Sequence, residues 1–302
     1  MRSHRIHSLG ALFSVVHSIR RRWKLSPRKE LWFRAETTNY GSTRLRPKLY
    51  RPLDERPLKS IHSLLSTDDF FYQEFIRCAP QLCQLNTSEE WDWEWYFLMQ
   101  HHGVPTRLLD WTDGALIALH FALWDRSLSK GGKPLVFVAD PYWLLDVLEK
   151  ATDRADAKAR WEKYCVKHPS ADNNADDWDD LYLPDDSKEK LLRIPDVPML
   201  WDSPHVSRRV AAQRSRFMIF GRSPTWLSDI ASRTDSRIER IVVERRDIER
   251  LKQELKDAGM VESVIFPDLD GLGRELSQEW ERRLSRKHGP TVSRRRRPSA
   301  RS

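Results

Sequence analysis

The chain has 302 residues, of which 39% are hydrophobic and 13 are tryptophans, so it has ample material for a hydrophobic core. The formal net charge is +8, but it is unevenly distributed. Residues 1–29 carry eight Lys/Arg and residues 286–302 carry seven, with no acid in either segment, whereas residues 30–285 carry a net charge of −7. The acidic body is unsuited to following a nucleic-acid backbone, which leaves the basic tail as the means of contacting nucleic acid.

No apolar run approaches the roughly 20 residues needed to cross a bilayer, so no membrane span is expected. Cys78, Cys83 and Cys165 include no Cys-x-x-Cys pair, which favours a reducing cytoplasm over a disulfide framework or a zinc site. Residues 151–190 concentrate aspartates but lack the spacing of a calcium-binding loop. No bound metal is therefore expected.

Hydrophobic periodicity predicts the elements of the first half of the chain. Apolar residues at near-helical spacing indicate a helix within residues 1–24, and we expect it to dock on the domain as part of a basic N-terminal helix or arm at residues 1–29. The aromatic stretch LWFRA, residues 31–35, indicates a strand that leads into a basic, turn-rich loop. Helices are expected next, at residues 68–78, 89–100 and 113–127.

The second half mixes single strands with helices. The stretch PLVFVAD, residues 134–140, predicts a central strand, and a helix is expected at residues 143–150. Residues 151–190 are expected to form an acidic, polar insertion or loop. The remaining predictions are strands at 216–221, 237–244 and 261–267, helices at 247–259 and 270–287, and a disordered basic tail at 286–302.

These elements do not alternate regularly, which favours an α+β fold over a doubly wound parallel sheet. We predict a single mixed domain over residues 30–285, with a central antiparallel or mixed sheet flanked by helices.

The most unusual stretch is QHHGVPTRLLDWT, residues 100–112, directly before an apolar helix. It gathers donors, acceptors and charges where a short polar turn would be enough, and loops entering rigid elements commonly carry chemistry. We predict that this stretch lines a ligand site. The candidate residues are His102, Thr106, Arg107, Asp110, Trp111 and Thr112.

Most of these residues also have a structural interpretation. His102 can bond a backbone carbonyl, and Arg107 and Asp110 can form a structural ion pair. Trp111 can fill the core, and Thr112 can cap the following helix. The density of polar groups in so short a stretch supports the ligand site instead.

Three arginines precede this stretch. Arg34 follows the aromatic strand, and Arg44 and Arg46 lie in the basic loop after it. A guanidinium group can hold a phosphate through two parallel hydrogen bonds. We predict that these arginines form a phosphate cradle, with a solvated loop as the alternative.

Four stretches resemble, in this order, the FRG domain, which is named for a Phe-Arg-Gly motif. They are WFRA at 32–35, LMQHHGVPTRLLDWT at 98–112, RVAAQRSRFMIF at 209–220 and FPDLDGLGREL at 266–276. Ala35 stands where the motif has glycine. The resemblance extends over roughly residues 25–285.

The same order is similar to the plan of ADP-ribosyltransferases: an arginine ending an early strand, a Thr or Ser at a strand-to-helix junction, and a Glu or Gln on a late strand. This resemblance implies an ADP-ribosyltransferase-like fold, NAD as the ligand and catalytic roles for Arg34, Thr112 and Gln213. Gln213 carries no negative charge, so a carboxylate such as Asp110 would have to stabilise the positive charge that develops on the ribose.

Functions of different classes remain open at this point. One hypothesis is an enzyme that transfers ADP-ribose from NAD to an unknown acceptor. The alternative is a non-catalytic ligand-sensing or protein-interaction module. Nucleic-acid contact through the basic ends is a further alternative.

Overall fold

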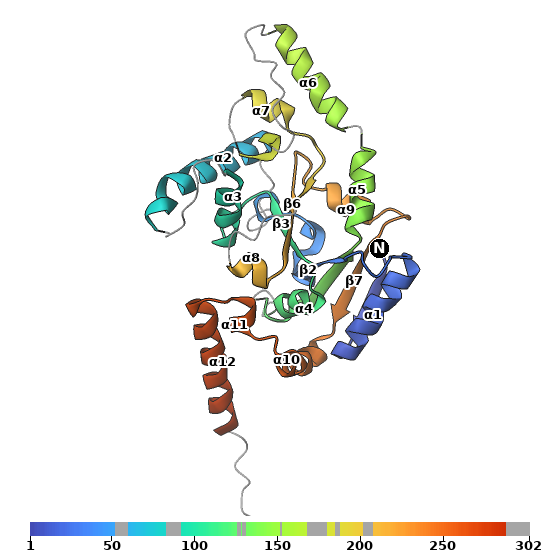
Figure 1. Cartoon of the computed structure of the whole chain (residues 1–302), viewed down its shortest axis with the longest axis vertical. Helices are drawn as coiled ribbons and strands as arrows, with labels where there is room; N and C mark the ends of the chain where they lie inside the picture. Colours follow the sequence, from blue (N-terminus) through green and yellow to red (C-terminus); the bar gives the residue numbers. More distant parts are fainter. Residues whose placement is uncertain are drawn as a thin grey trace, which may run out of the picture.

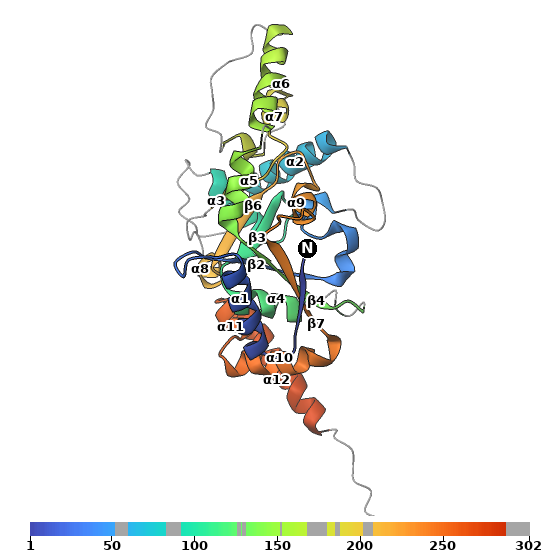
Figure 2. The same cartoon turned by 90° about the vertical axis from the view of Figure 1, so that its right-hand side faces the viewer.

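The computed structural model describes residues 1–51, 60–82, 92–125, 128, 131–151, 153–167, 180–184, 188–201 and 208–287. They form one mixed seven-stranded sheet with helices on both faces (Figures 1 and 2). The strands lie in the order β1-β7-β4-β2-β3-β6-β5. Their bounds are Ser3–Ile6 (β1), Trp32–Thr37 (β2), Leu108–Thr112 (β3), Pro134–Ala139 (β4), Met199–Trp201 (β5), Ser215–Ile219 (β6) and Ile238–Val243 (β7).

Several helices begin at residues whose side chains cap them. The Ser8 hydroxyl accepts from a backbone N–H at the start of α1, Ser60 does so for α2, and Asp140 for α5. The helices are α1 (Leu9–Arg22), α2 (Ile61–Cys78), α3 (Asp92–His101), α4 (Ala115–Leu123), α5 (Pro141–Glu149), α6 (Asp153–Lys167), α7 (Lys188–Arg193), α8 (Arg208–Ala212), α9 (Trp226–Ala231), α10 (Ile248–Asp257), α11 (Glu262–Ile265) and α12 (Leu269–Lys287).

The middle of the sheet is formed by β4 and β2, which pair antiparallel over six residues. Every residue of β4 is buried, as its uncharged sequence predicts. At one edge, β1 pairs parallel with β7, whereas the other pairings are antiparallel. The prediction of an α+β fold with a mixed sheet flanked by helices is confirmed.

Strand β2 contributes to a hydrophobic core on each face of the sheet, because successive side chains of a strand point to opposite sides. Trp32 packs into one core with Tyr50 and Trp111. Phe33 packs into the other core with Leu12 of α1 and Leu119 of α4. The sheet is therefore covered on both sides, and α4 lies directly against β2 and β3 (Figure 1).

Residues 1–29, predicted as a basic N-terminal helix or arm with the helix docked on the protein, contain an edge strand and a helix that pack against the sheet. Within this segment β1 forms an edge strand, and α1 buries Leu12 and Ile19 against the sheet. Arg20, Arg21 and Arg22 lie in the last turn of α1, where cations complement the helix dipole.

Two further segments differ from the elements expected there. The acidic stretch 151–190, predicted as a polar insertion or loop, contains the helix α6. Residues 261–267, expected as a strand, contain the single-turn helix α11. Apolar alternation over so few residues does not distinguish a strand from one helical turn, and here Glu262 and Ile265, three residues apart, are the buried ones.

Among the helices that the structure describes, none is long and apolar enough to cross a membrane. The predicted basic tail at 286–302 lies outside the described residues apart from its first two, which end α12.

Candidate functional site

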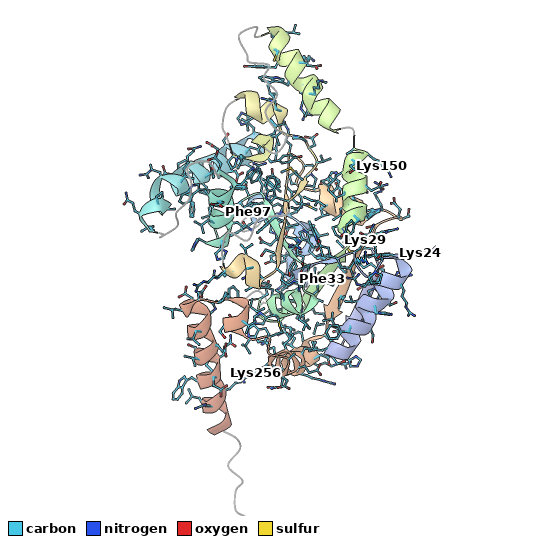
Figure 3. All side chains as sticks on the ribbon, viewed as in Figure 1. Lys24, Lys29, Phe33, Phe97, Lys150 and Lys256 are labelled. Carbon is cyan, nitrogen blue, oxygen red and sulfur yellow. The ribbon has the colours of Figure 1, made fainter. Side chains whose placement is uncertain are left out.

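A cavity of about 710 Å³ opens where β2 and β3 separate. Phe33 of β2 and Phe97 of α3, both labelled in Figure 3, contribute two of its walls. The strand side of the cavity, from β2, β3 and the start of β6, is formed by Arg34, Ala35, Asp110, Trp111, Thr112, Ser215 and Phe217. The helix side, from α3, α4, α8, α11 and α12 and adjoining residues, includes Gln100, His101, His120, Phe121, Trp124, Arg209, Gln213, Glu262, Phe266, Arg274 and Gln278.

The opening arises from the pairing of the strands. β2 and β3 share one paired position, Phe33 opposite Thr112, whereas β2 pairs with β4 over its full length. Beyond that position the two strands diverge, and Arg34 bridges the gap by donating from Nη1 to the backbone carbonyl of Asp110, 2.6 Å away. The sheet thus brings an arginine and a carboxylate to the edge of the same cavity.

Arg34 is held in place from behind by Glu36, which is 1% exposed. The Nε of Arg34 lies 3.0 Å from Glu36 Oε1, and Arg51 Nη2 lies 2.9 Å from the same oxygen. The backbone N–H of Leu45 also donates to this carboxylate. The buried charge is therefore well satisfied, and the direction of the Arg34 side chain is fixed.

Asp110 is accessible to solvent from the cavity. Its Oδ2 accepts from Gln100 Nε2 at 2.9 Å, and Gln100 in turn accepts from the hydroxyl of Thr106. The protein that surrounds Asp110 on its other sides raises the pKa of its carboxyl, and nearby Arg34 only partly offsets this effect. A carboxyl with a raised pKa is suited to accepting a proton.

Thr112 and Gln213 are joined directly. The Thr112 hydroxyl donates to the backbone carbonyl of Gln213 at 2.7 Å and accepts from the Gly114 N–H at the entry to α4. The side-chain amide of Gln213 donates to the backbone carbonyl of Ile265 in α11, 3.2 Å away. Both residues line the cavity, and both also hold its walls together.

On the helix side, Arg209 contacts three different groups. Its Nε lies 2.7 Å from Asp268 Oδ2, its Nη1 donates to His101 Nε2 at 3.1 Å, and its guanidinium lies over the ring of Phe266. Burial and the positive charge of Arg209 lower the pKa of His101 to about 4, so this histidine is neutral at pH 7. Arg209 therefore brings a fixed positive charge to the cavity.

The structure brings together the three residues predicted as catalytic, Arg34, Thr112 and Gln213, with Asp110 beside them. Trp111 borders the cavity but is 2% exposed and packs against Trp32, which agrees with the alternative that this residue fills the core.

Other predicted ligand residues lie elsewhere. Arg107 is fully buried and paired with Asp68. Thr106 acts through Gln100 without reaching the cavity. Likewise, Arg44, Arg46 and His102 do not line the cavity.

Sequence reasoning missed His101, His120, Arg209, Glu262 and Arg274. For His101 the helical spacing was a usable signal. The cavity residues of α3, at positions 97, 100 and 101, share one helix face, whereas His102 lies beyond the end of the helix. His120 is the one polar residue of the apolar helix α4. Glu262 and Arg274 gave no signal, since their segments carry no pattern that relates them to the cavity.

Comparison with known families identifies one segment of the chain. Residues 29–130 match the family model of the FRG domain, so the chain carries an FRG domain. The matched segment includes β2, α3, β3 and α4, which contribute Arg34, Asp110 and Thr112 to the cavity. No curated protein and no solved structure matches the chain.

Proposed function

We propose that the cavity binds a phosphate-bearing nucleotide of the NAD type and that the protein transfers ADP-ribose from it to an acceptor. One observation carries the proposal: Arg34, Thr112 and Gln213, from three separate parts of the chain, line one cavity. Their order follows the ADP-ribosyltransferase plan that the FRG-like stretches resemble. The volume of about 710 Å³ lies within the range of small-molecule and cofactor sites.

The phosphates are assigned to the arginines of the cavity. Arg34 uses Nε and Nη1 within the protein, and no described residue hydrogen-bonds its Nη2, which leaves that group for a phosphate oxygen. Arg209 adds a second guanidinium from the helix side. Fixed guanidinium groups lose little conformational entropy when a phosphate binds.

The chemistry needs negative charge near the ribose. When the bond between nicotinamide and C1′ breaks, its electron pair leaves with nicotinamide and positive charge develops on the sugar. The acceptor then bonds to C1′ and gives up its proton. Asp110 is suited to stabilise the sugar and to take this proton, because Gln213 has no carboxylate.

The proposal is tested by calorimetry with NAD and by measuring nicotinamide release. We expect Arg34→Ala to weaken NAD binding by about tenfold or more, equivalent to about 1.4 kcal/mol. Asp110→Asn should keep binding within a few-fold and lower turnover by about 100-fold or more. Asp146→Asn, on the exposed side of α5, is the matched control and should behave as wild type. Absence of NAD binding at millimolar ligand would exclude the proposal.

A second function is favoured by the contact between Gln213 and Ile265. The Gln213 amide is engaged in holding α11, and no carboxylate occupies its position. The same cavity can then bind the nucleotide without turnover, as a ligand-sensing module. In that case NAD raises the melting temperature through binding linkage, but no nicotinamide is released.

A further inference from the structure

His120 is buried on the helix side of the cavity without a hydrogen-bond partner. It is 1% exposed, it lines the cavity, and neither Nδ1 nor Nε2 is hydrogen-bonded. Buried polar side chains are normally hydrogen-bonded, and leaving one without a partner destabilises the protein. Burial lowers the pKa of His120 to about 4, so at pH 7 its ring offers one N–H donor and one acceptor nitrogen.

Glu262 lies beside His120 and is also buried, at 6% exposure. Its Oε2 accepts from Arg274 Nε at 3.1 Å. Its Oε1 lies 3.8 Å from His120 Nε2, too far for a hydrogen bond, and has no hydrogen-bond partner among the described residues. His120 Nε2 and Glu262 Oε1 therefore lie side by side on the cavity wall, and each is able to hydrogen-bond a bound ligand.

Aromatic side chains surround this pair. The ring of His120 stacks on Trp124 with centroids 4.3 Å apart. Phe121 and Phe266 meet edge to face at 5.7 Å, and all three aromatic residues line the cavity. Such walls suit a flat ring, which gains from stacking and apolar contact.

We infer that His120, Glu262 and the rings of Trp124, Phe121 and Phe266 form a subsite for a flat heteroaromatic ring that presents an amine donor next to an acceptor atom. This inference rests on the proposed function, because both ends of NAD carry such a group. Adenine presents its 6-amino group next to a ring nitrogen, and nicotinamide presents a carboxamide. His120 donates to the acceptor, and Glu262 Oε1 accepts from the amine.

Glu262 is the residue that makes the subsite prefer a ring with an amine over one with an oxygen at the same place. A carboxylate oxygen can only accept, so it favours an amine and opposes an oxygen at the same place. Replacing the amine by an oxygen should leave two acceptors facing each other in a buried site, a mismatch comparable to an unmade hydrogen bond. A glutamine at position 262 can turn its amide to donate or to accept, and so relaxes this preference.

The experiment measures the affinity of the full chain, by calorimetry, for NAD and two analogues. Nicotinamide hypoxanthine dinucleotide lacks the adenine amine, and nicotinic acid adenine dinucleotide lacks the carboxamide amine. Wild type should bind one of the two analogues at least about tenfold more weakly than NAD. The weakened analogue identifies which ring occupies the subsite.

Glu262→Gln should reduce this preference to within about threefold, for that analogue alone. Glu275→Gln is the matched control. It lies on α12, accepts from the Ser263 N–H at 3.0 Å and does not line this cavity, so it should keep the wild-type preference. Equal binding of all three ligands by wild type, or an unchanged preference in Glu262→Gln, overturns the inference.

These measurements distinguish failure of the ring subsite from failure of the proposed function. If wild type binds NAD and both analogues equally, the ring subsite is wrong and the nucleotide site stands. If no dinucleotide binds, the proposed function is wrong, and the subsite is tested with adenosine against inosine and nicotinamide against nicotinic acid. A preference for the amine-bearing member of either pair that Glu262→Gln removes supports the subsite, and its absence overturns it.

Discussion

Arg107 and Asp68 form an ion pair in the interior, with Arg107 Nε 2.7 Å from Asp68 Oδ2. Tyr96 donates its hydroxyl to Asp68, and Arg107 also donates to the backbone carbonyls of Phe220 and Tyr182. Burial lowers the pKa of Arg107, but the Asp68 carboxylate more than compensates and raises it above the ordinary value. The pair ties α2 and α3 to β3, so it positions one wall of the cavity.

We predict that Asp68→Asn lowers the free energy of unfolding by about 3–5 kcal/mol, because it leaves the Arg107 charge buried without its partner. Urea denaturation monitored by tryptophan fluorescence measures the loss. Glu74→Gln, in an exposed pair with Arg77 on the same helix, should leave the unfolding midpoint essentially unchanged. Similar midpoints for the two variants would show that the interior pair has no such role.

His120 should make the fold sensitive to acid. Its pKa is about 4 in the folded protein and near 6.5 when unfolded, so only the unfolded chain takes up this proton between these values. Its contribution is constant above pH 6.5 and is lost as the pH falls towards 4, by about 2 kcal/mol at pH 5. His120→Phe should be no less stable at pH 7 and should lose less stability on acidification. Unfolding free energies that fall in parallel for both proteins would contradict this assignment.

Gly271 lets α12 approach the cavity closely. A Cβ at this position would lie 2.0 Å from the backbone oxygen of Phe266, whereas a Cβ on Gly273 meets nothing within 4 Å. We predict that Gly271→Ala lowers the unfolding free energy by about 1–3 kcal/mol and weakens nucleotide binding, because α12 carries Arg274. Gly273→Ala should stabilise by up to about 1 kcal/mol and leave binding unchanged. Thermal melts and calorimetry on the two variants provide the comparison, and equal effects would exclude the close approach as the cause.

Much of the site could be predicted because its residues lie in one unusual stretch and at the end of an aromatic strand. The same stretch was interpreted as a loop, yet residues 108–112 form the interior strand β3. Strand alternation explains the difference within β3: Asp110 and Thr112 face the cavity, whereas Trp111 borders the cavity but packs mainly into the core on the other face of the sheet. Arg107 could not be separated from them by sequence, since its partner Asp68 lies on a distant helix.

The C-terminal helix α12 shows a second limit of prediction from the sequence. Leu272, Leu276 and Trp280 occur at helical spacing, the usual sign of a buried face, but they are 44%, 62% and 61% exposed. The polar side of α12, with Arg274 and Gln278, lines the cavity instead. Periodicity located this helix correctly, but the face that borders the cavity is the polar one, and its apolar residues do not mark a buried face.

Two substitutions of Gln213 distinguish a structural role of this residue from a catalytic one. Gln213→Ala and Gln213→Glu both remove the hydrogen bond to the Ile265 carbonyl, so each should lower the unfolding free energy by about 1–3 kcal/mol. Only the glutamate adds the negative charge that an ADP-ribosyltransferase needs near the ribose. With NAD at saturation, we expect Gln213→Glu to release nicotinamide about tenfold faster than Gln213→Ala, although the glutamate is no more stable, because its carboxylate cannot donate to the Ile265 carbonyl. Equal rates in the two variants would show that Gln213 acts on the fold alone, by linking the segment between α8 and β6 to α11.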